Sequence, residues 1–254
     1  MQSTVAALFR HPVKGFTPER LAAADLAVGA TLAHDRMYAV EIGDCGFDPA
    51  APAFVPKTKF AVLAHIADVA KARTRYDDAA DLFHASAPGH PDFAGDLTGE
   101  AGRDAFAGWL AGLLGEEARA PLKVLQAPGA WRFTDHPLGH VSIVNLASLR
   151  DLESRVRRPI DPLRFRANLY VDGWPAWIEN DWAGRTLSVG GATATAFKPI
   201  VRCAATHVNP ETAERDLDVV AALFENYGHT LCGLYVQTTA AGRVAEGDVV
   251  ELKA

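Results

Sequence analysis

The sequence has few cysteines, no long apolar run and no excess of positive charge. Only three cysteines occur in 254 residues, at Cys45, Cys203 and Cys232, too few and too scattered for a disulfide framework or a zinc site. No apolar stretch could span a bilayer, and no basic segment followed by an apolar one opens the chain, so we expect a cytoplasmic protein without membrane association. The net charge of −6 argues against a nucleic-acid surface.

The motifs of several cofactor-binding modules are missing as well. There is no glycine-rich phosphate loop and no cysteine array for an iron–sulfur cluster. What is present is 49% hydrophobic and 22% charged residues, a composition typical of a globular protein. The length allows one large domain or two modest domains that share a core.

The most informative stretch is Phe-Lys-Pro-Ile-Val-Arg-Cys-Ala-Ala-Thr-His-Val-Asn-Pro-Glu-Thr at residues 197–212. It places the Cys203 thiol directly after Arg202 and before a polar turn. A cysteine is often a small buried hydrophobe with no chemical role. An adjacent arginine and an exposed loop would instead favour a thiolate, which serves as a nucleophile or as a ligand for a soft metal. The stretch alone leaves both interpretations open.

This stretch resembles the signature of the MOSC family, the domains related to the C-terminal part of molybdenum cofactor sulfurase. The matching positions are Pro199, Arg202, Cys203, Thr206, Val208, Asn209, Pro210 and Thr212. Two positions depart from the pattern, because Asn209 stands where Asp is usual and Ala213 stands where Gly is usual. Neither change removes a ligand that the family pattern implies.

Segments before the signature are similar to the same family. Pro-Val-Lys-Gly, with Lys14 and Gly15, resembles the Pro-Val-Lys-Ser that opens the family's N-terminal β-barrel domain and approaches the cofactor phosphate. Arg36 lies in an Asp-Arg-x-aromatic segment whose arginine helps to hold the cofactor in the family, although an ion pair with Asp35 would also explain it. Lys57 and Thr58 occupy a loop near the family's substrate face, where a solvated loop is the plainer interpretation.

A second group of candidates surrounds Arg166. The segment Phe165–Val171 resembles the family's Phe-Arg-Pro-Asn strand, with Ala167 in place of proline. An arginine that enters a covered strand is costly unless an anion pairs with it, so Arg166 and Asn168 are binding candidates. Ser142 and Asn145 lie at a predicted strand-to-helix junction, where they would cap the helix or contact an anion.

The resemblance implies a mainly β protein with some α-helix (α+β). We expect an N-terminal MOSC β-barrel domain at residues 1–120 and a MOSC domain, itself a β-barrel with peripheral helices, at residues 121–254. Apolar spacing predicts helices at residues 60–71, 103–114 and 214–227.

The function that the resemblance implies is reduction of N-hydroxylated substrates by a molybdenum cofactor (Mo-molybdopterin). Cys203 would be the catalytic thiolate and the molybdenum ligand. The cofactor would be bound by Lys14, Gly15, Arg36, Ser142, Asn145, Arg166, Asn168, Arg202 and Thr206. Electrons would come from an external donor of the ferredoxin or cytochrome b5-type reductase class, because this chain carries no flavin or iron–sulfur module.

Two alternatives to the reductase remain. Cys203 could carry a persulfide received from a pyridoxal-phosphate-dependent cysteine desulfurase, since the same reactive thiol serves both roles. A simple persulfide carrier, however, needs no set of phosphate-directed basic residues. The chain could also be a non-enzymatic β-barrel module that binds a partner or a small anion.

Overall fold

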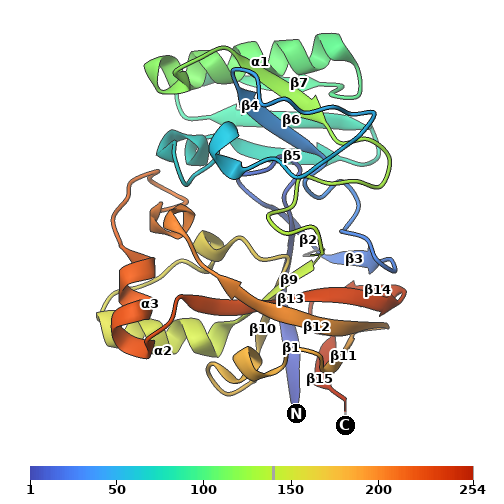
Figure 1. Cartoon of the computed structure of the whole chain (residues 1–254), viewed down its shortest axis with the longest axis vertical. Helices are drawn as coiled ribbons and strands as arrows, with labels where there is room; N and C mark the ends of the chain where they lie inside the picture. Colours follow the sequence, from blue (N-terminus) through green and yellow to red (C-terminus); the bar gives the residue numbers. More distant parts are fainter. Residues whose placement is uncertain (139–140, 254) are drawn as a thin grey trace.

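The computed structural model describes residues 1–138 and 141–253, and these form two stacked parts (Figure 1). The lower part is a closed barrel that contains both ends of the chain. The upper part contains smaller sheets and the long helix α1 (Glu100–Leu114). The predicted mainly β architecture with a few helices is confirmed. Within the described residues, no helix has the length and apolar character needed to cross a membrane.

The barrel is a ring of seven strands in the order β10-β9-β13-β12-β11-β15-β1, and a pairing between β1 and β10 closes it. Its strands are β1 (Gln2–Arg10), β9 (Val141–Asn145), β10 (Leu169–Asp172), β11 (Thr186–Val189), β12 (Ala192–Val201), β13 (Leu231–Ala240) and β15 (Val249–Leu252). β9 and β10 are parallel, whereas the other neighbours in the ring are antiparallel. Closing the ring leaves these strands without a free edge.

Alternation along the strands explains why the chain folds into this ring. In β11 every second residue is buried, and the first half of β12 follows the same rule. Side chains of a strand point alternately to its two faces, so each strand sends one apolar set inward. The inward set includes Leu187, Val189, Ala194, Leu234 and Val236, and together with Val5 and Leu8 of β1 it forms one core cluster.

The upper part is built from two small sheets covered by α1. β4 (Tyr38–Ile42) pairs with β8 (Leu122–Gln126), and β5 (Arg73–Asp77), β6 (Leu82–Ala87) and β7 (His90–Gly95) form a three-stranded antiparallel sheet. Helix α1 buries Phe106 and Leu110 against these sheets, where Phe106 contacts Phe83 edge to face with ring centroids 4.8 Å apart. Edge-to-face pairs of this kind add to the stabilisation from area burial.

Strand pairing crosses the predicted boundary near residue 120 in both directions. β1 completes a barrel whose other strands all follow residue 140, and β8 returns to pair with β4. The short strands β2 (Glu19–Leu21) and β3 (Ala23–Leu26) also join later strands or β1, since β3 pairs with β14 (Gly242–Ala245). The division of the sequence into two domains at residue 120 therefore stays a prediction. In the folded protein, each of the two parts contains strands from both sides of that position.

The predicted helices have three different outcomes. The helix at 103–114 is confirmed as α1, and the helix at 214–227 is confirmed only as α3 (Val219–Tyr227). The helix at 60–71 is wrong, because its residues form turns and the short 3-10 helix η2 (Ala67–Lys71). Its apolar residues are buried as expected. The apolar spacing therefore predicted which residues are buried, but not the backbone conformation of the segment. Helix α2 (Leu146–Val156) follows β9 as predicted.

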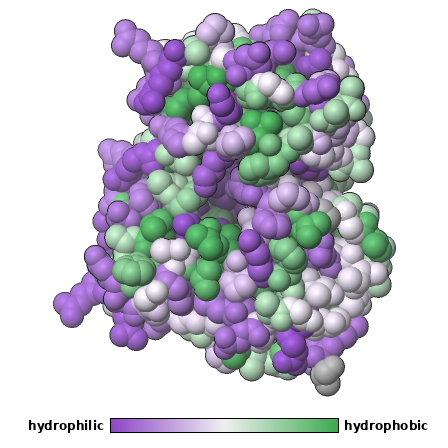
Figure 2. Space-filling model, in the orientation of Figure 1, coloured by the Kyte–Doolittle hydropathy of each residue, from purple (hydrophilic) through white to green (hydrophobic). Residues whose placement is uncertain are grey.

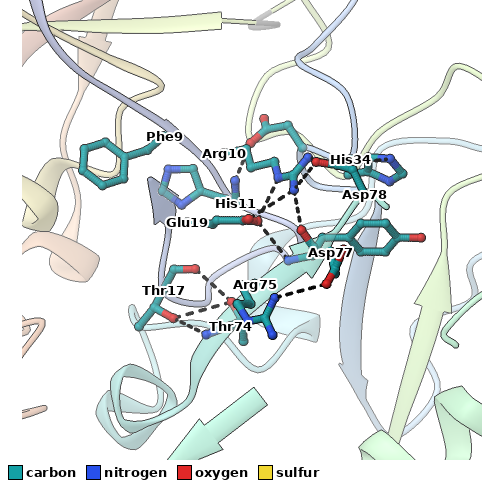
Figure 3. A network of polar contacts seen from close by, with 12 residues as sticks. Phe9, Arg10, His11, Thr17, Glu19, His34, Thr74, Arg75, Asp77 and Asp78 are labelled. Atoms are coloured by element: carbon teal, nitrogen blue, oxygen red, sulfur yellow. Dashed lines mark hydrogen bonds and ion pairs between the residues drawn. The ribbon is translucent and has the colours of Figure 1, made fainter. Parts of the chain in front are cut away.

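A buried arginine links the barrel to the upper part (Figure 3). Arg10, at the end of β1, donates to the Glu19 carboxylate at 2.8 Å, to Asp78 at 2.8 Å and to the Tyr76 carbonyl at 2.6 Å. His34 stacks on the Tyr76 ring with centroids 4.1 Å apart. Because a buried guanidinium is costly without partners, this network ties β1 and β2 to β5.

Candidate functional site

A cavity of about 350 Å³ is lined by residues of both parts. The face drawn in Figure 2 is hollowed between the upper part and the barrel, with hydrophilic residues in the hollow. The charged residues that line the cavity are Lys14, Arg36, Lys57, Asp135, Arg164, Arg166, Lys198 and Arg202. Seven of these eight residues are basic, so the cavity is suited to an anionic ligand.

Cys203 lies in this cavity as a free and partly exposed cysteine. It directly precedes the 3-10 helix η6 (Ala204–His207), whose Thr206 donates its hydroxyl to the Cys203 carbonyl at 2.9 Å. Arg164 contacts the same loop, donating to the His207 carbonyl at 2.9 Å and pairing with Asp216 at 2.5 Å. Thr206 lines the cavity, but its hydroxyl is hydrogen-bonded to the main chain of the loop that carries the Cys203 thiol.

Arg202 is anchored by main-chain oxygens. Its Nε donates to the Cys232 carbonyl and its Nη1 to the Phe165 carbonyl, both at 2.7 Å. Its Nη2 is buried and has no partner among the described residues. Gly233 makes room for this group, because a Cβ there would lie 3.0 Å from Nη2 and 2.5 Å from the Ile143 carbonyl oxygen. An unpartnered N–H of a cation is a donor available to a bound anion.

Lys14, Arg36 and Arg166 come together although they are far apart in the sequence. Lys14 follows β1, Arg36 precedes β4, and Arg166 ends the 3-10 helix η4 (Pro162–Phe165). Lys14 donates to the Phe133 carbonyl at 3.1 Å and to the Asp135 carboxylate. Arg36 pairs with the fully buried Asp35, and Arg166 donates to the Phe16 carbonyl. The ion pair with Asp35 is present, and Arg36 also lines the cavity, so its part in cofactor binding stays a prediction.

Burial and mutual repulsion shift the pKa values of these cations. Burial, followed by the charge of Arg36, lowers the pKa of Arg166 to about 10. Burial also lowers the pKa of Lys14, and Asp135 offsets only part of that effect. Burial alone would lower the pKa of Arg36, but Asp35 and Asp135 more than offset it. Arg166 forms no ion pair with an acidic residue among the described residues, whereas Lys14 and Arg36 each do. The positive charge of Arg166 is therefore the least compensated of the three and the most available to a bound anion.

Arg36 and Arg166 also share an uncommon backbone conformation. Their φ angles are +50° and +52°, in the left-handed region that side chains with a Cβ rarely adopt. The Arg36 Nη2 donates to the Arg166 carbonyl at 3.4 Å, and the Arg36 amide donates to the His11 carbonyl at 2.6 Å. Strained residues of this kind tend to cluster at ligand sites, where the surrounding structure holds them in place.

The sequence did not single out the residues that complete the cavity wall near Cys203. Lys198 of β12 pairs in register with Tyr235 of β13, and the Tyr235 ring lies 6.3 Å from that of His136. Of the two residues in the loop near the family's substrate face, Lys57 lines the cavity, whereas Thr58 does not. Burial lowers the pKa of Lys57, but the neighbouring Cys203 and Asp135 more than offset that effect. Lys198 and Tyr235 could have been predicted to lie together only from the register between β12 and β13.

Two sequence candidates lie behind the wall instead of lining it. Asn145 caps helix α2, accepting from the Ala147 amide at 3.1 Å, and donates to the Glu179 carboxylate at 3.0 Å. Asn168 accepts from the Ser142 amide and hydroxyl and donates to Asp35 at 3.2 Å. Ser142 itself lines the cavity. The chain of bonds from Ser142 through Asn168 to Asp35 positions Arg36.

The positions that depart from the family pattern are each accommodated locally. Gly15 has a φ of +87°, and a Cβ there would lie 2.6 Å from Val62 Cγ1. The Ala167 amide, which proline would lack, donates to the Tyr170 hydroxyl at 3.1 Å. Asn209 keeps the turn by accepting from the Glu211 amide at 2.9 Å, and its own amide donates to Asp216 at 3.2 Å. Ala213 takes a φ of +61°, a conformation that glycine adopts more readily.

The residues present fit an anionic, sulfur-liganded metal cofactor. Among the described residues there is no cluster of three or more His, Cys, Asp or Glu that could hold a bare metal ion. The donor set is instead one thiol together with cations that include the unpartnered Arg202 Nη2. A single soft ligand plus a basic cradle suits a metal that arrives with most of its ligands and a phosphate attached.

Comparison with known families gives two matches that together span most of the chain. The family model for the MOSC domain matches residues 132–251, and the model for the MOSC N-terminal beta barrel domain matches residues 2–117. A search of curated proteins found no match.

A search of solved structures matched the YuaD protein from Bacillus subtilis, at 13% identity and a TM-score of 0.49, covering 99% of this chain and 96% of that one. YiiM from Geobacillus stearothermophilus, at 17% identity and a TM-score of 0.37, covers 45% of this chain and 54% of that one. YiiM from Escherichia coli has 21% identity, a TM-score of 0.32 and the same coverage. The two family models together assign the chain to its family.

Proposed function

The chain belongs to the MOSC domain family, whose members are associated with molybdenum cofactor binding, and from this premise we propose that it is a molybdenum-dependent oxidoreductase that reduces N-hydroxylated substrates. One observation carries the proposal. Cys203 lines the same cavity as Lys14, Arg166 and Arg202. The positive charges of these three residues outnumber the negative charge of Asp135, which also lines the cavity. A thiolate and a phosphate-directed cradle are the two features that a molybdopterin requires of its protein.

Each residue has a defined part in this proposal. Lys14 and Arg166 would bind the pterin phosphate by charge-assisted hydrogen bonds, with Arg36 held beside them by Asp35. Cys203 would ligate molybdenum, and Arg202 would favour its thiolate form. Bound molybdenum would supply two-electron reduction, in which two electrons and two protons convert an N–OH group into N–H and water. Lys57 and Tyr235 line the cavity wall and can contact the substrate.

The partners remain part of the proposal. In this proposal, two electrons per turnover come from a protein of the ferredoxin or cytochrome b5-type reductase class. The small-molecule substrate would enter the cavity near Cys203, beside the exposed Val201. The cytoplasmic location also stays a prediction.

A sulfur carrier is the second candidate. Cys203 is the one cysteine that lines the cavity among the residues described here, so no neighbouring thiol would attack a persulfide formed on it. In this alternative the sulfur comes from a pyridoxal-phosphate-dependent cysteine desulfurase. The basic residues of the cavity favour the cofactor over the carrier, because a persulfide alone needs no phosphate cradle.

The test is a reductase assay with an N-hydroxylated amidine as substrate and a reduced viologen dye as electron source. Protein from a host that makes the cofactor should reduce the substrate, and Cys203→Ser should abolish the activity. Cys45→Ser is the matched control, because Cys45 is also partly buried but lies outside the cavity lining. Full activity in Cys203→Ser, or no activity in molybdenum-loaded wild type, would contradict the proposal. An added sulfur atom on Cys203 in inactive protein would favour the carrier.

A further inference from the structure

Asp135 is the one acidic residue that lines the basic cavity within the described part of the chain. Its carboxylate accepts a hydrogen bond from Lys14 Nζ, whose other acceptor is the Phe133 carbonyl oxygen at 3.1 Å. The two side chains differ in exposure, since that of Lys14 is 6% exposed and that of Asp135 is 60% exposed. The cation is thus fixed in the wall, whereas the carboxylate of its counter-ion is accessible from the cavity.

The charge of Asp135 acts on more than Lys14. Desolvation would raise the pKa of Asp135, but Lys14, Arg36 and Lys57 hold that pKa well below its usual range. The same carboxylate opposes the lowering of the Arg166 pKa. One carboxylate is therefore within electrostatic reach of four cations of the cavity, which is where a ligand's anionic group would be bound most strongly.

Charge balance decides whether Asp135 can stay when an anion arrives. The three cations assigned to the phosphate, Lys14, Arg36 and Arg166, carry three positive charges, and Asp35 and Asp135 carry two negative charges, which leaves a net charge of plus one in this cluster. Lys57, the fourth cation, neighbours Cys203 and is not counted in it. A phosphate monoester brings a charge of about −2. With both carboxylates in place the cluster would become negative. If Asp135 leaves, the cluster becomes neutral.

Asp35 cannot be the carboxylate that leaves. Its side chain is fully buried, and it also accepts from the His11 amide at 2.7 Å and from Asn168 at 3.2 Å. Asp135 has no such anchors, because among the described residues Lys14 is the one partner of its carboxylate. The segment that precedes Asp135 is fixed by packing, since Phe133 is buried and contacts Phe60 with ring centroids 5.8 Å apart. Lys14 can therefore keep the Phe133 carbonyl and exchange only the Asp135 carboxylate.

We propose that Asp135 is an intramolecular counter-ion that occupies the phosphate position of the cavity and is displaced when a phosphate-bearing ligand binds. This inference rests on the proposed function, because it assumes that Lys14, Arg36 and Arg166 form an anion cradle. The inference adds that the Asp135 carboxylate occupies this cradle before a ligand binds. The buried Lys14 charge is then never left without a partner, and ligand affinity is lowered by the competition.

The test measures binding of inorganic phosphate by calorimetry at low ionic strength, with the full chain purified from a host that cannot make the cofactor. Asp135→Asn removes the negative charge but keeps an acceptor oxygen for Lys14, so the fold should persist. It should bind phosphate about tenfold more tightly than wild type. Adding Arg166→Met to Asp135→Asn should reverse that gain. Asp135→Ser, with the same charge change, should behave as Asp135→Asn does.

Asp78→Asn is the matched control. Its side chain is 58% exposed and pairs with a buried cation, Arg10, but it does not line the cavity. It should bind phosphate as wild type does. If wild type binds phosphate and Asp135→Asn binds it equally or more weakly, the displacement is wrong and the cradle stands. If neither protein binds phosphate, the cradle itself fails and the displacement fails with it.

Discussion

The Thr206 hydroxyl donates to the carbonyl oxygen of Cys203 at 2.9 Å, and the Thr206 amide donates to the same oxygen at 3.0 Å. One threonine thus fixes the peptide group that follows the thiol. The signature spacing between these two residues, three positions apart, is the spacing at which a turn of 3-10 helix brings a side chain back to its start. The geometry of the thiol therefore depends on Thr206.

Replacing Thr206 by valine should lower the free energy of unfolding by about 1 kcal/mol, because a buried hydroxyl bond is lost at nearly constant volume. Thr212→Val is the control, since Thr212 is exposed in the same loop, and it should change stability by less than about 0.5 kcal/mol. Urea unfolding of the three proteins measures both effects. Equal stabilities of Thr206→Val and Thr212→Val would contradict the role assigned to Thr206.

Restoring the family's serine at position 15 should destabilise this chain. Gly15→Ser forces a left-handed φ on a residue with a Cβ, at about 1–2 kcal/mol, and adds a clash with Val62 Cγ1 and Cα. Gly89→Ser separates the two effects, because Gly89 has a φ of +71° and nothing within 4 Å of its Cβ position. Thermal unfolding should show a larger loss for Gly15→Ser. A loss no larger than that of Gly89→Ser would mean that Val62 yields without cost.

Restoring the family's proline at position 167 should also destabilise the protein. Ala167→Pro removes the amide that donates to the Tyr170 hydroxyl, and proline disfavours the helical backbone of the preceding residue, here Arg166 in its left-handed form. We expect a loss of about 2 kcal/mol or more. Tyr170→Phe removes this hydrogen bond, and the one from the Tyr170 hydroxyl to the Pro162 carbonyl, without restricting the backbone, and it should still cost less. Wild-type stability of Ala167→Pro in chemical denaturation would refute this account.

His11 should make the protein less stable in mild acid. It is fully buried, and burial, followed by the charges of Arg166 and Arg36, holds its pKa well below the usual value. The unfolded chain binds a proton near pH 6.5 that the folded protein does not bind, so stability falls as pH decreases below that value, by up to about 1.4 kcal/mol per pH unit. His11→Gln should flatten this part of the profile. His65→Gln, at an exposed position, should leave it unchanged; a steep profile that persists in His11→Gln would show that other groups cause it.

Short motifs allowed much of the site to be predicted, because their residues are neighbours in sequence. Cys203 with Arg202 and Thr206, and the isolated cations Lys14, Arg36 and Arg166, all line one cavity. Lys198 and Tyr235 could not be found this way, since they meet through the register of β12 and β13. Asp135 could not be found either, because its loop carries no periodic pattern and the four cations around its carboxylate, Lys14, Arg36, Lys57 and Arg166, come from distant segments.

Fold prediction failed where an apolar pattern admitted two conformations. Residues 60–71 bury Phe60, Leu63, Ile66 and Val69 as a helix would. The segment instead begins with a bridge from Phe60 to Glu41 and continues in turns. Periodicity reports which residues are buried, whereas pairing with β4 decides the backbone. The sharing of β1 and β8 between the two parts also depends on long-range pairing, which motif order along the chain does not reveal.

The central claim is that Cys203 and the cations around it hold a molybdenum cofactor. The most direct measurement is the molybdenum and pterin content per chain of protein purified from a host that makes the cofactor, for wild type, Cys203→Ala and Cys45→Ala. We predict near-stoichiometric molybdenum and pterin in wild type and in Cys45→Ala, and a marked loss of molybdenum in Cys203→Ala. Wild-type protein without molybdenum or pterin, or a Cys203→Ala variant with full molybdenum content, would contradict the claim.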